Sequence, residues 1–224
     1  MLTRTVAAAT LIISGVLILT PLAAHAAPHH QLQPLASVTP VFVEFETPLG
    51  NIYVELQPAD APKTVANFLS YVTSGKYAKT FISRSVPGFV VQGGGYSFTH
   101  DKVGVIPEGK VVVNEYKLPN AAYTLAMAKG TAVNSATDQW YFNEASNPDL
   151  NTEDGGYTVF GKIATFDSVP ASASIEVLKK VSDAKIANVG SPFTTIPVIN
   201  YKSGKDVTQK NLIMVDIKEV TRSS

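Results

Sequence analysis

The sequence predicts a mainly β domain, an antiparallel barrel or sandwich whose open ends are covered by two helices. Three observations predict this fold class. Many short apolar or alternating runs are bounded by turn residues, which is typical of antiparallel strands. Only two segments have the periodicity of an amphipathic helix. Strands and helices do not alternate along the chain, so a parallel sheet with crossover helices is not favoured.

The domain is expected to start near residue 41 with a β-hairpin. Residues 41–46 and 51–56 alternate apolar and polar side chains around the sequence Thr47-Pro48-Leu49-Gly50. Proline at the second position and glycine at the fourth fit a type I turn, so the two runs are predicted to pair as neighbouring strands.

A helix is predicted next, from about Asp60 to Gly75. Asp60 is the expected N-cap, and Pro62 suits the first turn, where a backbone N–H is not needed. Four apolar residues at spacings of three and four form one face of this helix: Val65, Phe68, Leu69 and Val72.

The segment Phe81–Gly95, with the sequence FISRSVPGFVVQGGG, is predicted to form two short strands around a Pro87-Gly88 turn. Arg84 lies inside the first of these strands, and an arginine in such a position is ordinarily solvated or half of a surface ion pair. The glycines at 93–95 favour a tight turn or a bulge over a phosphate-binding loop.

Further strands are predicted at residues 123–128, 139–143, 157–163 and 212–220. A second helix fits residues 172–181, with Ile175, Leu178 and the aliphatic stem of Lys179 facing inward. The loop at 189–210 is long, and two interpretations stay open for it: a structural hairpin or a surface that recognises a partner.

Residues 1–26 are predicted to be a secretory signal peptide. Arg4 precedes an apolar run that ends before Pro21, and Ala24-His25-Ala26 offers an A-x-A cleavage site. The alternative is an uncleaved membrane anchor, but the run is shorter than the roughly 20 residues that cross a bilayer. We therefore expect export to the periplasm, a flexible lead at 27–40, a single domain at 41–224 and no membrane association after cleavage.

Composition excludes several classes of function. The chain has no cysteine, so disulfides, thiol catalysis and thiolate metal sites are excluded. None of the four histidines has metal-ligand spacing with a carboxylate, so no metal site is predicted. Removing Arg4 from the 18 basic residues leaves 17 against 18 acidic ones, a net charge of −1 without basic clusters. This balance gives no electrostatic reason to expect nucleic acid as a partner.

Four motifs, in this order along the chain, resemble those of the cyclophilins, the peptidyl-prolyl cis/trans isomerases, and most closely the exported bacterial members. They are APKTVANF at 61–68, Arg84 with GFVVQGGG at 88–95, LAMA at 125–128 and VFGK at 159–162. The resemblance covers residues from about 41 to 220. It implies an eight-stranded antiparallel β-barrel capped by two helices, with a site on the outside of the barrel.

The resemblance also implies a set of site residues. The catalytic arginine of the family matches Arg84. Its apolar proline pocket matches Phe89, Val90, Tyr141 and Leu150. The residues that hold the peptide match Gln92, Gln139, Ala128 and Lys129, and Tyr157 matches the residue that closes the pocket. Without the resemblance, the four apolar residues would be assigned to an ordinary core.

Several positions depart from the family's pattern. Ile82-Ser83 replaces the usual Phe-His before the arginine, which is expected to loosen the support of Arg84. Tyr141 replaces phenylalanine, so its hydroxyl has to find solvent or a partner. Lys129 stands where asparagine or arginine is common. Asp149 replaces the tryptophan that favours cyclosporin, so cyclosporin binding is expected to be weak.

The resemblance implies an isomerase that accelerates rotation of Xaa-Pro amide bonds in exported proteins. Arg84 would donate a hydrogen bond to the proline nitrogen while the apolar pocket holds the ring. No cofactor and no metal are implied, the partners are proline-containing polypeptides, and a monomer is expected. The alternative that the departures leave open is a catalytically weak proline-peptide-binding module or holdase chaperone.

Overall fold

The computed structural model describes residues 40–223; the predicted signal peptide at 1–26 and nearly all of the predicted lead lie outside this range. The strands are β1 Phe42–Thr47, β2 Gly50–Leu56, β3 Thr80–Phe81, β4 Arg84–Val86, β5 Val90–Gly93, β6 Tyr96–Thr99, β7 Lys102–Val105, β8 Thr124–Met127, β9 Trp140–Asn143, β10 Val159–Ile163, β11 Lys185–Ala187, β12 Ile196–Val198 and β13 Met214–Val220. The helices are α1 Pro62–Thr73 and α2 Ala171–Ser182, with short 3₁₀ helices η1 Pro148–Asn151, η2 Glu153–Gly155 and η3 Gln209–Asn211. Neither α1 nor α2 is long and apolar enough to cross a bilayer, and the described range holds no other helix that is.

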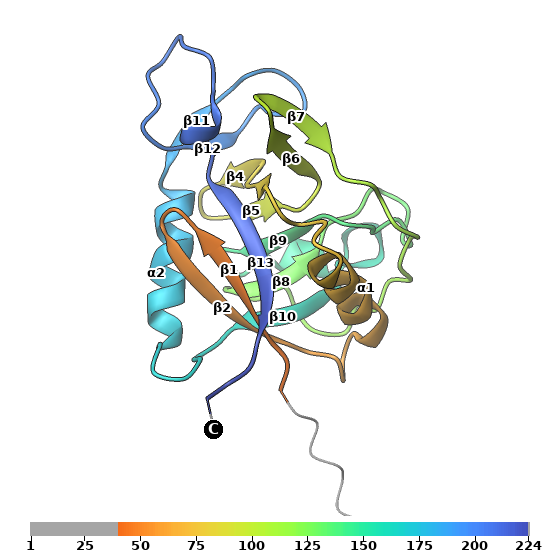
Figure 1. Cartoon of the computed structure of the whole chain (residues 1–224). Helices are drawn as coiled ribbons and strands as arrows, with labels where there is room; N and C mark the ends of the chain where they lie inside the picture. Colours follow the sequence, from red (N-terminus) through yellow and green to blue (C-terminus); the bar gives the residue numbers. More distant parts are fainter. Residues whose placement is uncertain (1–39, 224) are drawn as a thin grey trace, which may run out of the picture. The chain divides into compact units, whose positions relative to one another are not determined.

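Eleven strands form one curled antiparallel sheet in the order β4-β5-β9-β8-β10-β2-β1-β13-β3-β6-β7 (Figure 1). Its end strands β4 and β7 are not hydrogen-bonded to each other, so the sheet is a half-barrel. The predicted mainly β fold with two helices is confirmed, although the strand count exceeds the expected eight. The chain changes pairing partners at Ile82-Ser83, which divides one extended stretch into β3 and β4, and the β6–β7 hairpin adds two strands at one edge.

The predicted first hairpin and first helix are confirmed. Thr47 pairs with Gly50 at the end of β1 and β2, so Pro48 and Leu49 form the turn. The expected N-cap of α1 is wrong, because Ala61 is the N-cap residue and Asp60 instead pairs with Lys117 at 2.6 Å. The backbone N–H groups of Lys63 and Thr64, which belong to the first turn of the helix, donate to the carboxylate of Glu115 at 3.2 and 2.8 Å. A residue 51 positions away thus does the capping, which no local pattern could predict.

The main core lies inside the curl of the sheet, and both helices pack against it. Val65, Phe68 and Tyr71 of α1 meet Val177, Leu178 and Val181 of α2 and the inward side chains of the strands in one apolar cluster. The predicted second helix is confirmed within one residue at each end. Lys179 does not face inward as predicted, because it lies on the exposed side of the last turn.

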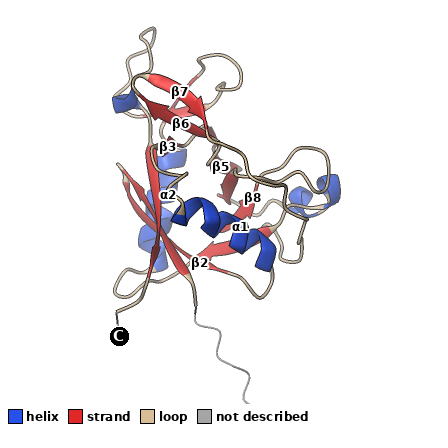
Figure 2. Ribbon diagram, turned by 45° about the vertical axis from the view of Figure 1, so that its right-hand side comes forward, coloured by secondary structure: helices blue, strands red, loops and turns tan. Residues whose placement is uncertain are grey.

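The long loop near the C-terminus has a small core of its own. β11 and β12 pair as a hairpin, and their residues Ala187, Ile196 and Val198 pack with Phe81 and Phe98 from β3 and β6. β11 and β12, which carry part of this second cluster, lie at the end of the domain opposite the C-terminus, near the β6–β7 hairpin (Figures 1 and 2). Of the two interpretations of residues 189–210, the structural hairpin is the one that these contacts support.

Glu44 is a buried carboxylate on β1, and we expect it to make stability depend on pH. Burial opposes its ionisation, but hydrogen bonds from Tyr53 and Lys218 outweigh this effect, so the pKa of Glu44 is lowered. A pKa lowered by folding stabilises the protein above the unfolded-state pKa, and this gain is lost as the pH falls through the folded-state pKa. Glu44→Gln is therefore expected to reduce the free energy of unfolding by about 1 to 2 kcal/mol at pH 7 and by less at pH 3.5.

Urea unfolding at the two pH values measures this difference. Glu219→Gln is the matched control, because Glu219 lies on the adjacent strand β13 with its side chain exposed. Its effect should be small at both pH values. An effect of Glu44→Gln that stays constant between pH 7 and pH 3.5 would contradict the role assigned to the ionised carboxylate.

Candidate functional site

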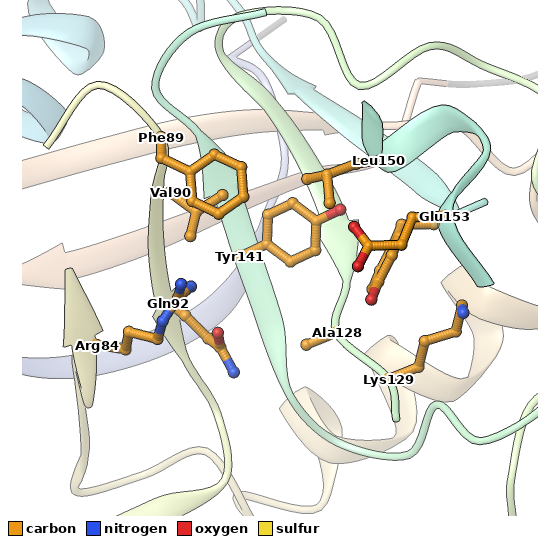
Figure 3. Close-up of a pocket in the computed structure, with 10 residues that line it drawn as sticks. Arg84, Phe89, Val90, Gln92, Ala128, Lys129, Tyr141, Leu150 and Glu153 are labelled. Carbon is orange, nitrogen blue, oxygen red and sulfur yellow. The ribbon is translucent and has the colours of Figure 1, made fainter. Parts of the chain in front are cut away.

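A pocket of about 270 Å³ opens on the outer face of four neighbouring strands, β4, β5, β9 and β8 (Figure 3). Two loops complete it, one after β8 and one that holds η1, η2 and the residues before β10. Ten residues line the pocket: Arg84, Phe89, Val90, Gln92, Ala128, Lys129, Tyr141, Leu150, Glu153 and Tyr157. Nine of these ten belong to the predicted site, and the tenth, Glu153, was not predicted.

The apolar wall of this pocket is a separate cluster on the outside of the sheet. Val90, Ala126, Tyr141, Leu150 and Val159 are buried together there. Their neighbours in sequence, such as Val91 and Phe142, point to the other face and join the main core. Successive side chains of a strand face opposite sides of the sheet, so these strands are apolar on both faces. One face stabilises the fold and the other forms the pocket.

Arg84 lies on β4, at one side of the pocket (Figure 3). Its guanidinium carbon is 5.7 Å from the ring centroid of Phe89. Burial lowers the pKa of Arg84, but a guanidinium keeps its proton in proteins and stays charged. No side-chain hydrogen bond or ion pair within residues 40–223 involves it. A half-buried cation whose donors are free is suited to a ligand that offers an acceptor.

The backbone around Arg84 is held on both sides. Ile82 is buried in the core and donates to Ile213 O at 3.0 Å, and Ser83 donates to Gln92 O at 3.0 Å. On the outer edge of β4, Ser85 donates to Thr195 O at 2.8 Å, which joins this strand to the loop before β12. The main chain around Arg84 is thus fixed by these three hydrogen bonds, although this chain has Ile82-Ser83 where Phe-His is usual in the family that it resembles.

Gln92 and Gln139 lie next to each other at the same edge of the pocket. The Gln92 amide nitrogen donates to the Gln139 side-chain oxygen at 3.0 Å. Gln139 itself does not line the pocket, so it contacts the site through Gln92. The glycine run makes this arrangement possible, because a Cβ at Gly94 would lie 2.7 Å from Asp138 O and one at Gly95 would lie 2.7 Å from the Gln139 side chain. Gly94 also has a φ of 98°, which favours glycine.

The hydroxyl of Tyr141 finds a buried partner. It donates to Asn120 Oδ1 at 2.8 Å, and burial raises the pKa of Tyr141, so the hydroxyl stays neutral. The Asn120 amide nitrogen in turn donates to Leu150 O at 3.3 Å and to Tyr157 O at 3.2 Å. Asn120 is 1% exposed, and through these hydrogen bonds it connects three pocket residues, Tyr141, Leu150 and Tyr157, from behind the pocket. Sequence reasoning missed Asn120, since no local pattern links it to these partners.

Lys129 and Glu153 lie on the side of the pocket opposite Arg84 (Figure 3), and Tyr157 lines the pocket next to Lys129. The Lys129 ammonium donates to Asp154 O at 2.9 Å and lies 4.4 Å from the ring centroid of Tyr157. The Tyr157 ring stands edge-on to that of Tyr141, with centroids 6.1 Å apart. Glu153 could have been expected here, because it lies between Leu150 and Tyr157, two residues of the predicted site.

The side chains that could ligate a metal are dispersed within residues 40–223. There, no three side chains of His, Cys, Asp or Glu gather as a metal site would need. The chemistry available to the pocket is hydrogen bonding by Arg84 and Gln92 beside an apolar surface.

Comparison with known proteins decides the family. Residues 42–203 match the family model described as cyclophilin type peptidyl-prolyl cis-trans isomerase. The chain belongs to the cyclophilin family of peptidyl-prolyl cis-trans isomerases. A cyclophilin relative, the peptidyl-prolyl cis-trans isomerase A of Dickeya dadantii, is 37% identical over 164 residues, which are 72% of this chain and 81% of the relative. The isomerase B of Escherichia coli is 36% identical over 126 residues, 54% of this chain and 76% of the relative.

Solved structures agree with the cyclophilin fold. A cyclophilin type isomerase of Cryptosporidium parvum has a TM-score of 0.59 and 21% sequence identity, and the match covers 83% of this chain and all of that one. At this identity the likeness concerns the fold. It agrees with the curled sheet and the two helices described above.

Proposed function

We propose that this cyclophilin binds the proline of a polypeptide in the pocket and accelerates cis/trans rotation of the preceding Xaa-Pro amide. The observation that carries the proposal is Arg84, a charged donor that has no side-chain hydrogen-bond or ion-pair partner among residues 40–223 and lies beside an apolar pocket. A second Cryptosporidium parvum cyclophilin structure, 22% identical with a TM-score of 0.57, is of a crystal in the presence of the dipeptide Ala-Pro. That ligand has the chemistry which the pocket of this chain would take.

Arg84 would act by binding the twisted amide better than the planar one. The planar Xaa-Pro amide has partial double-bond character, with a barrier of roughly 18 to 20 kcal/mol. Rotation removes the resonance, and the proline nitrogen regains a lone pair that accepts a hydrogen bond. A fixed guanidinium donor beside that nitrogen lowers the barrier, because the contact is stronger in the transition state than in either ground state.

The pocket would supply the remaining stabilisation. A charged hydrogen bond is worth about 1.5 to 3 kcal/mol, and each 1.4 kcal/mol or so of preferential stabilisation gives a tenfold rate. Phe89, Val90, Tyr141 and Leu150 would hold the ring and exclude water from the amide. Gln92, supported by Gln139, would hold the flanking chain while the other side rotates. No proton is transferred in this reaction.

The test is exchange NMR on a short Ala-Pro peptide, with and without the purified protein. We expect the exchange between the cis and trans forms to be faster with the protein. A folded protein that binds the peptide but leaves the exchange rate unchanged would contradict isomerase activity and favour the alternative, a proline-peptide-binding module or holdase.

We also propose that the protein is exported, so that its substrates are Xaa-Pro bonds of periplasmic proteins. The charged start, the apolar run and the A-x-A site within residues 1–26 support this proposal. N-terminal sequencing of the protein from a periplasmic fraction is expected to start at Ala27. A protein that starts at Met1 and stays in the cytoplasm would contradict it.

A further inference from the structure

One side of the pocket carries the cation Arg84, and the other carries the carboxylate of Glu153 beside the ammonium of Lys129. Figure 3 shows Arg84 on one side of the Tyr141 ring and Glu153 on the other, with the Glu153 carboxylate turned toward the pocket. Two further acidic residues, Asp149 and Asp154, belong to the same loop. We call Asp149, Glu153 and Asp154 the acidic rim. A bound peptide would therefore meet Arg84 at one end of the pocket and this rim, with Lys129 beside it, at the other.

The carboxylate of Glu153 is free to bind a ligand. It is exposed, and no side-chain hydrogen bond or ion pair among residues 40–223 engages it. The nearby cation, Lys129, is held elsewhere, by Asp154 O and the ring of Tyr157. Burial raises the pKa of Tyr157, and the charges of Glu153 and Asp154 raise it further, so the negative charge acts on a pocket residue.

Glu153 is also held in a defined place. The Asn114 side chain donates to Gly155 O at 3.0 Å and to Gly156 O at 2.8 Å, and Lys129 holds Asp154 O on the other side. Gly156 has a φ of 82°, and a Cβ there would lie 2.6 Å from the ring of Tyr116. The loop that carries Glu153 is thus held by two neighbouring segments, residues 114–116 and the one that holds Lys129, and does not depend on the ligand for its position.

We propose that Glu153 is a specificity-determining residue which favours polypeptides with a lysine or arginine next to the proline. This inference rests on the proposed function, because it assumes that the proline ring occupies the apolar part of the pocket. The residues that flank the proline then leave the pocket along its sides, and one of these sides presents Glu153. A cationic neighbour pairs with the carboxylate, whereas an acidic neighbour is repelled by it.

The experiment compares peptides that differ in one residue beside the proline. Two series, X-Pro and Pro-X, with X as Lys, Ala or Glu, are measured for kcat/KM at low ionic strength. In at least one series the wild-type protein is expected to prefer Lys over Glu by about threefold or more, the size of effect that an exposed ion pair allows. Glu153→Gln, which keeps the shape of the side chain, should bring this ratio close to one. Higher salt should reduce the wild-type ratio.

Glu176→Gln is the matched control, because Glu176 is exposed on α2, does not line the pocket and carries the same charge. It should keep the wild-type Lys-to-Glu ratio. Three results would each overturn the inference. The Lys-to-Glu ratio could be near one in the wild type, it could be unchanged in Glu153→Gln, or it could fall equally in Glu176→Gln. The Ala peptides distinguish a failure of this inference from a failure of the proposed function. An active isomerase accelerates their cis/trans exchange whether or not Glu153 selects charged neighbours. If the wild type accelerates no peptide, the proposed function fails and the inference fails with it.

Discussion

Replacing Arg84 by alanine is expected to lower kcat/KM for an Ala-Pro peptide by about 10- to 150-fold, the range that a lost charged hydrogen bond of 1.5 to 3 kcal/mol predicts. The loss should lie mainly in kcat, because in the proposed mechanism the contact with the proline nitrogen forms only as the amide twists. Exchange NMR at several peptide concentrations measures both constants. Stability should change little, since the Arg84 side chain has no ion pair to lose among the described residues.

Two further variants sharpen this result. Arg84→Lys keeps a positive charge but loses the planar set of donors, so its rate should fall between those of the wild type and the alanine variant. Arg222→Ala is the matched control, because Arg222 packs on Phe42 and donates to Thr165 O, away from the pocket. An Arg84→Ala protein with the wild-type rate, or an equal loss in Arg222→Ala, would refute the role proposed for Arg84.

Replacing Asn120 by alanine is expected to lower the free energy of unfolding by about 2 to 4 kcal/mol, because it leaves several buried polar groups without a partner. It should also raise KM more than it lowers kcat. Asn120 does not touch the pocket space, but it holds the Tyr141 hydroxyl and the carbonyl groups of Leu150 and Tyr157. We therefore regard it as a positioning residue. Urea unfolding and the exchange assay measure the two effects.

A purely structural role would lower stability and leave KM unchanged. Asn211→Ala is the matched control, because the Asn211 amide also donates to two carbonyl groups, Ile199 O and Asn200 O, but far along the chain from the pocket. It should lower stability without raising KM. A double-mutant cycle with Tyr141→Phe tests the direct contact, since the two changes should be non-additive by about 1 kcal/mol. Additive effects would mean that the hydroxyl does not act through Asn120.

Local patterns predicted the elements of the fold well where one signal dominated. The Pro48-Leu49 turn and the periodicities of the two helices gave bounds within about two residues of those observed, because turn chemistry and an apolar face are local properties. The predicted N-cap of α1, Asp60, was wrong because capping of this helix is not a local property. Asp60 fits an N-cap locally, yet the carboxylate that caps the helix belongs to Glu115 in a distant loop.

The candidate site was predicted from the resemblance and not from periodicity. β9 is buried along its whole length, so its sequence cannot show that Tyr141 faces a pocket while Trp140 and Phe142 face the core. Asn120 was missed, because the carbonyl groups that it binds belong to segments that only the fold brings together. Glu153 lies between two predicted site residues, but the sequence does not show which residues of that loop face the pocket.

The hydrogen bond from Ser85 to Thr195 O links the strand that carries Arg84, the residue proposed to be catalytic, to a loop that does not line the pocket. β4 is an end strand of the sheet, and the loop before β12 binds its outer edge one residue from Arg84. Changes in the length or sequence of that loop would shift the strand that carries Arg84 and leave the other pocket residues in place. We therefore expect the turnover rate to be adjustable in evolution and in protein engineering by insertions in a surface loop, independently of which substrates are bound.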